Sequence, residues 1–167
     1  MTSTPDRSDP ASIRLVLIRH AKSDWGDSSL DDHDRPLGER GLRDAPRMAR
    51  ELTESGFRPD VILSSTALRA RTTAEAFAAE LGVAVTLDPE LYGASASTLL
   101  AIAAGSGALS VVLVAHDPGM SVLAGRLSGG RIEHMPTCAV ATFQWDTRDW
   151  DVVDSIEPTD WTFDSPR

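Results

Sequence analysis

An uncharged apolar run at residues 15–18 ends abruptly in Arg19 and His20, and this stretch constrains the fold more than any other. Four consecutive apolar residues without a charge are typical of a strand that is buried on both faces. Ligands of open α/β sheets bind just beyond the carboxyl ends of such strands. A guanidinium and an imidazole at this end suit an anion, and the imidazole is also a nucleophile. The stretch predicts either such a site or an ordinary polar strand end.

Composition restricts the classes of protein that fit this chain. Its 167 residues suit one domain, and 41% hydrophobic residues are enough for a sizeable core. The formal net charge of -9 argues against binding nucleic acid through a broad basic surface. The single cysteine, Cys138, fits a reducing cytoplasm, and no apolar run approaches the roughly 20 residues that span a membrane. We therefore expect a cytoplasmic protein with no nucleic-acid or membrane partner.

Strand patterns alternate with helix patterns along most of the chain. The expected strands are residues 13–18, 61–63, 83–87, 110–115, 138–145 and 150–156, and the expected helices are residues 39–55, 67–81, 97–104 and 120–127. In the first helix, the apolar stripe expected to face the core comprises Leu42, Ala45, Ala49 and Leu52. The alternation predicts a three-layer α/β sandwich with a mainly parallel sheet, helices on both faces and an antiparallel edge. The domain is expected over residues 13–157, between a disordered lead-in at residues 1–12 and a polar tail at residues 158–167.

Three of the expected strands lead to residues that favour phosphate. Arg19 and His20 end the first strand, Arg69 lies in the first turn after the second, and His116 ends the fourth. In a parallel sheet these ends share one edge, where a helix N-terminus adds free backbone N–H groups. Either histidine alone is more often structural. Two arginines and two histidines at one edge together favour a phosphoryl group.

Four motifs in this order resemble the histidine phosphatase superfamily, the phosphoglycerate-mutase-like proteins. They are LIRHAKSDW at residues 17–25, DRPL followed by ERG at residues 34–41, SSTALRARTTA at residues 64–74 and VAHDPG at residues 114–119. The second motif narrows the resemblance to small phosphohistidine phosphatases of the SixA type. The resemblance covers about residues 15–141.

The resemblance implies a role for each of the four residues. His20 would be the nucleophile that becomes phosphorylated, and Arg19, Arg69 and His116 would hold the phosphoryl oxygens. A neutral imidazole attacks phosphorus while nearby cations stabilise the charge of the transferring group. Water would then hydrolyse the phosphohistidine intermediate. Neither a metal nor another cofactor is expected, since the arginines supply the positive charge.

One departure from the family pattern bears on the substrate. Many members carry a glutamate general acid two residues after a leucine, but here Gly93 stands in that position after Leu91. A phosphate ester has a poor leaving group that needs a proton from such an acid, whereas a protonated imidazole leaves readily. The absence favours cleavage of P–N bonds. Glu90, Asp24 and Asp117 remain alternative proton donors.

Two further residues are candidates for binding substrate in the long polar loop at residues 23–36. Ser23 either donates a hydrogen bond to phosphate or caps the turn. Arg35 either lines the entrance or pairs with one of the neighbouring acids Asp31, Asp32 and Asp34. Trp25 is either a wall on the substrate side or a packing residue.

The substrate class is open at this stage. The expected substrate is phosphohistidine on a protein, and the alternative is a small-molecule phosphomonoester. A non-catalytic phosphate-binding module is disfavoured because all four core residues are present. An open site favours a protein substrate, whereas a deep pocket closed by the loop at residues 23–36 favours a small molecule. The sequence carries no signal for an oligomeric state.

Overall fold

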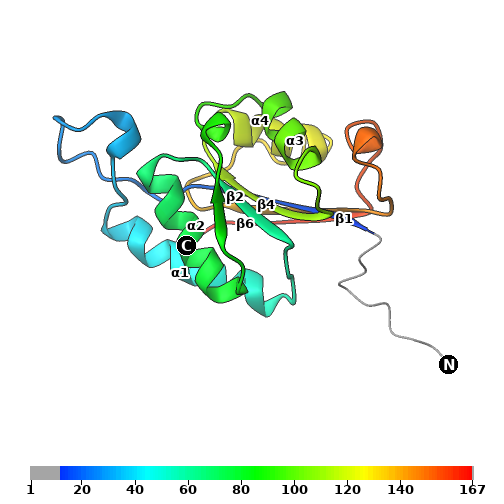
Figure 1. The fold of residues 1–167 in the computed structure, drawn as a ribbon, viewed down its shortest axis with the longest axis horizontal. Helices are drawn as coiled ribbons and strands as arrows, with labels where there is room; N and C mark the ends of the chain where they lie inside the picture. Colours follow the sequence, from blue (N-terminus) through cyan, green and yellow to red (C-terminus); the bar gives the residue numbers. More distant parts are fainter. Residues whose placement is uncertain (1–11, 167) are drawn as a thin grey trace.

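A six-stranded sheet in the order β3-β2-β4-β1-β5-β6 forms the centre of the computed structural model, which describes residues 12–166 (Figure 1). Its strands are β1 (Ile13–Arg19), β2 (Val61–Ser64), β3 (Val85–Leu87), β4 (Ser110–Ala115), β5 (Val140–Trp145) and β6 (Asp160–Asp164). The first four are parallel, whereas β5 runs antiparallel to both β1 and β6. This confirms the predicted mainly parallel sheet with an antiparallel edge. The predicted N-terminal lead-in lies, except for Ser12, outside the described residues.

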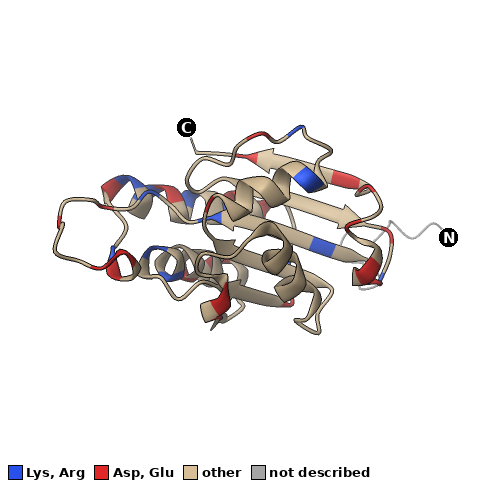
Figure 2. Ribbon diagram, turned by 90° about the horizontal axis from the view of Figure 1, so that it is seen from above, with Lys and Arg blue, Asp and Glu red and all other residues tan. Residues whose placement is uncertain are grey.

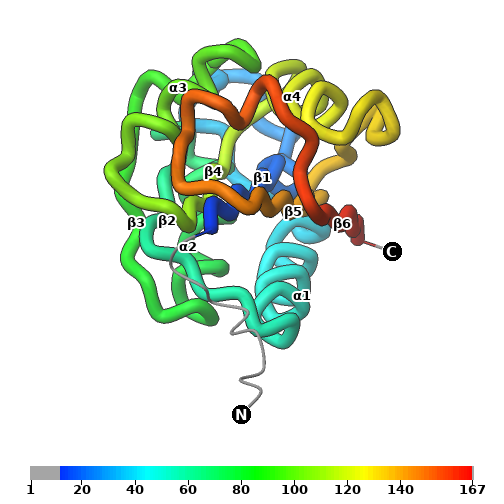
Figure 3. The backbone as a smooth tube through the Cα atoms, turned by 90° about the vertical axis from the view of Figure 1, so that its right-hand side faces the viewer, coloured from blue at the N-terminus to red at the C-terminus, as the bar shows by residue number. Residues whose placement is uncertain are grey.

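Two pairs of helices cover the two faces of the sheet, as the view in Figure 3 shows. One face carries α1 (Glu39–Glu54) and α2 (Leu68–Leu81), and the other carries α3 (Ala96–Ala104) and α4 (Gly119–Leu127). Short 3-10 turns lie in the connections, namely η1 (Asp32–Asp34), η2 (Pro89–Leu91) and η3 (Trp150–Val152). The layers confirm the predicted three-layer sandwich. No helix within residues 12–166 combines the length and apolar character needed to cross a membrane.

The central strand β1 is buried on both faces, as its apolar run predicts. Leu15 and Leu17 pack into the core with α3 and α4, whereas Val16 and Ile18 pack into the core with α1 and α2. None of these four side chains has exposed surface. Since β1 pairs with β4 on one side and β5 on the other, packing fixes it on all sides. Its carboxyl end is therefore a rigid base for Arg19.

The helix α1 buries Ala45, Ala49 and Leu52 of its predicted apolar stripe but leaves the fourth residue, Leu42, exposed. Leu42 is 55% exposed, whereas Ala45 and Met48 are buried. The first turn faces the core through Gly41 instead, and the helix continues through Pro46 without a break. Figure 2 shows Lys and Arg mixed with Asp and Glu along this helix. The prediction for Leu42 is wrong because close backbone packing, and not side-chain hydrophobicity, sets the orientation of the first turn.

The end of the chain also differs from its prediction. Residues 150–156 form η3 and a turn, not a strand, and the last strand β6 falls within residues 158–167, which we expected to be a polar tail. The indole Nε1 of Trp150 donates to a backbone carbonyl in the loop before β4, at 2.9 Å, and holds the segment against the sheet. In β6, Trp161 stacks on Phe143 of β5 with ring centroids 6.4 Å apart. This aromatic contact gives the strand its place at the edge.

Candidate active site

Three strand ends meet at one edge of the sheet. His20 directly follows β1 and His116 directly follows β4, and the two strands pair in parallel. On the other side of β4, β2 leads into α2, whose second residue is Arg69. The ring centroids of His20 and His116 are 5.1 Å apart, and the charges of Arg69 and Arg19 act on the His20 ring. The structure thus brings the four predicted core residues together.

The imidazole of His20 is held as a neutral base. Its Nδ1 atom lies 2.8 Å from the carbonyl oxygen of Ala21. A carbonyl oxygen only accepts, so Nδ1 carries the hydrogen and the lone pair of the neutral ring is on Nε2. Burial, together with the smaller effects of three arginine charges, lowers the pKa of His20 to about 4 against the opposing effect of this hydrogen bond. At neutral pH, Nε2 is therefore available for attack on phosphorus.

The turn that follows His20 is fastened to two helices. The backbone N–H of Ala21 donates to the hydroxyl of Thr73 at 3.0 Å, and that hydroxyl donates to the carbonyl of Arg69 at 2.8 Å. On the other side, α1 approaches so closely that a Cβ on Gly41 would lie 2.2 Å from the carbonyl oxygen of Lys22. Only glycine allows this contact. The position of the His20 ring therefore depends on the packing of both helices.

His116 contributes a second neutral imidazole to the same edge. Its Nε2 atom lies 2.7 Å from the hydroxyl of Ser65, while its Nδ1 atom is buried and has no partner among the described residues. Burial is the main cause that lowers the pKa of His116 to about 3, with smaller contributions from the neighbouring His20 and Arg69 against the opposing charge of Asp32. The hydroxyl of Ser65 thus fixes the orientation of the His116 ring at this edge.

Three arginines surround the pair of imidazoles, and neighbouring groups anchor each by its terminal nitrogens. Arg19 donates from Nη1 to the carbonyl of Met135 at 2.9 Å and pairs with Asp117 at 3.5 Å. Arg69 donates from Nη1 to the carbonyl of Asp32 at 2.7 Å and from Nη2 to its carboxylate at 2.9 Å. The Nε–H groups of Arg19, Arg69 and Arg35 are buried without a partner among the described residues. Three fixed cations with unused donors make a site for an anion.

The loop at residues 23–36 brings Arg35 to this cluster. Its guanidinium donates from Nη1 to the hydroxyl of Ser23 and from Nη2 to Asp32 at 2.7 Å, and it lies 3.6 Å from the ring centroid of Trp25. Of the acids offered by the sequence, Asp32 is therefore the partner. Ser23 accepts from Arg35 and is 8% exposed, whereas Trp25 is 70% exposed. The loop thus holds Arg35 beside the core residues and leaves Trp25 at the surface.

Four residues of the site were missed or only partly predicted from the sequence, since Asp32 was offered only as one possible partner of Arg35. They are Asp32, Ser65, Thr73 and Tyr92, which contact Arg69, His116, Ala21 and Asp32 respectively. Ser65 and Thr73 lie inside the motif around Arg69, which offered a signal. Asp32 and Tyr92 meet across 60 residues of sequence, and no spacing pattern connects them. The family's glutamate position is occupied by Gly93, which takes a φ of 73° in a turn after η2.

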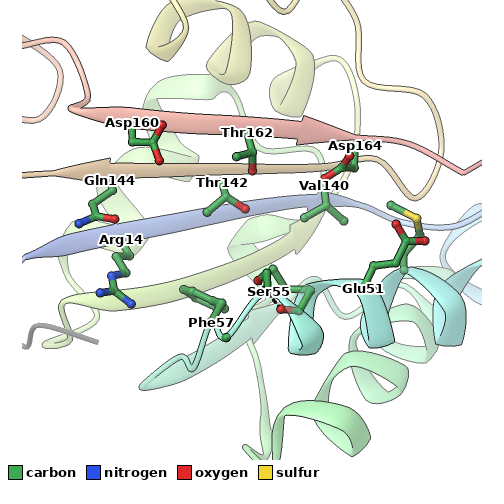
Figure 4. A pocket seen from close by; sticks show the side chains of 13 residues that line it. Arg14, Glu51, Ser55, Phe57, Val140, Thr142, Gln144, Asp160, Thr162 and Asp164 are labelled. Carbon is green, nitrogen blue, oxygen red and sulfur yellow. Dashed lines mark hydrogen bonds between the residues drawn. The ribbon is translucent and has the colours of Figure 1, made fainter. Parts of the chain in front are cut away.

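One cavity of the molecule is separate from the cluster of the two histidines and three arginines. A cavity of about 440 Å³ lies between α1 and the strands β1, β5 and β6, with Arg14, Phe57 and Gln144 among its walls (Figure 4). None of the site residues described above lines it. Within residues 12–166 there is no group of three or more His, Cys, Asp or Glu side chains placed to hold a metal ion. Metal independence of the reaction stays a prediction.

Comparisons with known proteins assign the chain to a protein family. The model of the histidine phosphatase superfamily (branch 1) matches residues 15–98. An uncharacterized chloroplast protein of Arabidopsis thaliana is 32% identical over 157 residues, which are 86% of this chain and 72% of that protein. The chain belongs to the histidine phosphatase superfamily, and the resemblance seen in its motifs is confirmed.

Solved structures narrow the similarity within this superfamily. A structure from Agrobacterium tumefaciens, provisionally named phosphohistidine phosphatase SixA, is 32% identical with a TM-score of 0.76, over 95% of this chain and 99% of that one. The structure of the protein histidine phosphatase SixA in complex with tungstate is 25% identical with a TM-score of 0.68, over 92% of this chain and 95% of that one. The chain is similar in fold and extent to SixA-type proteins.

Proposed function

We propose that this protein is a phosphatase that acts through a phosphorylated His20 and removes phosphate from phosphohistidine on a protein. The observation that carries the proposal is the set of three anchored arginines with unused Nε–H donors around a neutral His20. A phosphoryl group fits this arrangement, since guanidinium groups bind its oxygens and the imidazole attacks its phosphorus. The similarity to SixA-type structures supports the same substrate class.

The reaction has two steps at the same phosphorus. In the first, the lone pair on Nε2 of His20 forms a P–N bond while the P–N bond of the substrate breaks, and the bonding pair leaves on the substrate's imidazole. In the second, water attacks phospho-His20. The bonding pair returns to Nε2 of His20, whose Nδ1 has kept its hydrogen, so the ring is neutral again. One proton of the water stays on the released phosphate and the other passes to the solvent. Arg19, Arg69 and His116 stabilise the charge on the three phosphoryl oxygens in both steps.

The surroundings of His20 favour a P–N bond over a P–O bond. The position of the family's glutamate carries Gly93, and the nearby Glu90 is exposed on η2. Asp32, the carboxylate closest to the arginine cluster, has its pKa held well below the usual range, chiefly by the hydrogen bond from Arg35. It therefore has no proton to donate at neutral pH. A leaving group that must gain a proton departs slowly here because the site lacks a positioned general acid. An imidazole that is already protonated needs no such acid and departs readily.

The shape of the site supports a protein substrate over a small molecule. In Figure 1 the loop at residues 23–36 extends away from the body of the protein, beyond the ends of α1 and α2. Large side chains around it are exposed, with Trp25 at 70%, Leu30 at 40% and Tyr92 at 39%. These exposed side chains offer a surface on which a folded protein that carries a phosphorylated side chain can dock.

A substrate panel tests the proposal. The purified protein is assayed with a phosphohistidine peptide, a phosphoserine peptide of the same sequence and a set of small phosphate esters, each with and without a chelator. We expect the highest kcat/KM for the phosphohistidine peptide and no effect of the chelator. A clear preference for one small ester would support the alternative, and activity lost on chelation and restored by magnesium would contradict the proposed chemistry.

A further inference from the structure

Asp32 is the acidic side chain at the mouth of the site, and the protein fixes it from three sides. Its Oδ1 atom accepts from Arg35 at 2.7 Å, and its Oδ2 atom accepts from Arg69 at 2.9 Å and from the hydroxyl of Tyr92 at 2.6 Å. A carboxylate has about four acceptor positions, so these three bonds leave about one position unused. The side chain is 49% exposed, so this position is accessible to a ligand.

The contacts of Tyr92 place the carboxylate of Asp32 beside the reacting groups. The Tyr92 ring packs edge-on against His116, with ring centroids 5.4 Å apart, while its hydroxyl holds Asp32. The charge of Asp32 is also felt at the His116 ring. Besides anchoring Arg35 and Arg69, a permanent negative charge next to a phosphate site repels the phosphoryl group. The charge is useful if the substrate brings a positive group to the same place.

We infer that Asp32 is a specificity-determining residue that accepts the ring N–H of the phosphorylated imidazole of the substrate. The inference rests on the proposed function and names the group that selects phosphohistidine. Phosphohistidine loses its phosphoryl group readily when the ring nitrogen that does not carry phosphorus is protonated. When the P–N bond breaks, the bonding pair stays on the imidazole and this second nitrogen keeps its hydrogen. The leaving group departs as neutral imidazole, and no proton moves to or from Asp32.

The same carboxylate disfavours phosphate esters. An alkoxide or phenolate leaves with a developing negative charge, which a fixed carboxylate repels, whereas an imidazolium ring is attracted to it. Asp32 therefore favours substrates with a P–N bond and at the same time disfavours substrates with a P–O bond.

The test compares Asp32→Asn with Asp31→Asn on two substrates. Asp31 is the exposed neighbour that precedes η1, and its side chain makes no capping hydrogen bond. We expect Asp32→Asn to lower the ratio of kcat/KM for a phosphohistidine peptide over p-nitrophenyl phosphate by at least ~10-fold, the scale for a hydrogen bond to a charged group. The Asp31→Asn variant should keep the wild-type ratio. Equal losses on both substrates would overturn the inference and leave Asp32 as an anchor for arginines.

The pH dependence supplies a second measurement that a purely structural role would not change. A carboxylate stabilises the protonated form of the bound phosphoimidazole and therefore raises the pH at which this form is lost. We expect the alkaline decline of activity on the phosphohistidine peptide to move to lower pH in Asp32→Asn. If the activity of Asp32→Asn declines at the same alkaline pH as that of the wild type, the inference is contradicted. If Asp32→Asn fails to fold, Asp32→Glu, which keeps the charge and displaces it, should still lower the substrate ratio.

Failure of the inference and failure of the proposed function give different results. If the wild-type protein is inactive on both substrates, the proposed function is refuted, and the inference that rests on it is refuted as well. If the wild-type protein prefers the phosphohistidine peptide and Asp32→Asn keeps this preference, the proposed function stands and only the inference is refuted.

Discussion

The Nδ1 atom of His20 donates a hydrogen bond to the carbonyl oxygen of the next residue, Ala21, at 2.8 Å. This bond stops the ring from rotating and assigns the hydrogen of the neutral imidazole to the nitrogen that faces away from the ligand. Because the Ala21 N–H is itself bound to Thr73, the ring orientation is linked to α2. The nucleophile is thus oriented before any substrate binds.

The first prediction concerns covalent catalysis. His20→Ala should abolish turnover, and rapid acid-free quenching of the wild type with labelled substrate should trap label on His20. His134→Ala is the matched control, since that side chain is 65% exposed. Turnover by His20→Ala near the wild-type rate would exclude attack by this residue.

The second prediction concerns the arginine that follows β2. Arg69→Ala should lower kcat/KM by at least ~100-fold, the scale for losing a preorganised donor to the transition state. Arg71→Ala changes the same helix two residues further on and should have little effect, because none of the contacts described above involves it. Steady-state kinetics on one substrate compares the two. Similar modest losses in both variants would show that Arg69 does not contact the phosphoryl group.

The third prediction concerns pH. Burial lowers the pKa of His20 to about 4 and of His116 to about 3, so both rings stay neutral in the folded protein where they would be protonated in the unfolded chain. The unfolded state then binds more protons between about pH 6.5 and 4, and the free energy of unfolding should fall as the pH is lowered through this window. Denaturant unfolding at several pH values measures the slope, and NMR titration of the ring of His20 should show a midpoint well below 6.5. A midpoint near 6.5 would contradict the neutral-base description.

The fourth prediction concerns the proton donor. Glu90 is exposed and its carboxylate lies outside the contacts of the site, so Glu90→Gln should leave the activity on phosphohistidine and phosphoserine peptides unchanged. The wild type should cleave the phosphohistidine peptide much faster than the phosphoserine peptide. If ester hydrolysis fell by roughly 100-fold in Glu90→Gln, as when a general acid is lost, Glu90 would be a relocated acid. The small-phosphomonoester alternative would then be preferred.

The fifth prediction concerns the contact between α1 and the turn after His20. In Gly41→Ala the added Cβ would lie 2.2 Å from a backbone oxygen, so the helix or the turn must shift. We expect a loss of about 1–3 kcal/mol in the free energy of unfolding, as for overpacked cores, and a lower kcat. In the control Gly38→Ala the new Cβ would have no neighbour closer than 3.7 Å. Thermal unfolding and kinetics of the two variants should therefore differ.

Sequence reasoning reached the core of the site because its signals were local. Each of His20, Arg69 and His116 directly follows an apolar strand or opens the next helix, and parallel strands bring such positions to one edge. Asp32 was offered only as a possible partner of Arg35, and it was missed as the partner of Arg69 for the opposite reason. It is one of several aspartates in the same loop, and only the path of that loop past α2 selects it as the partner of Arg69.

The two wrong predictions of secondary structure, at residues 150–156 and 158–167, have a similar origin. In β6, polar residues alternate with Trp161 and Phe163, a regular strand pattern that was obscured because the segment is short and ends the chain. Trp150 and its apolar neighbours suggested a strand earlier, but they pack as a 3-10 turn against the sheet. Burial of an aromatic ring decided both outcomes, and ring burial depends on contacts that local sequence does not specify.

The single cysteine offers a practical consequence. Cys138 is fully buried, and burial raises the pKa of its thiol to about 12, so the thiolate that maleimides and other alkylating reagents require is absent under ordinary conditions. We therefore expect thiol reagents to leave Cys138 of the native protein unlabelled. A cysteine introduced at the exposed Trp25 would be the one reactive thiol among the described residues, and a spin or fluorescent label attached there would report directly on movement of the loop as a phosphorylated partner arrives.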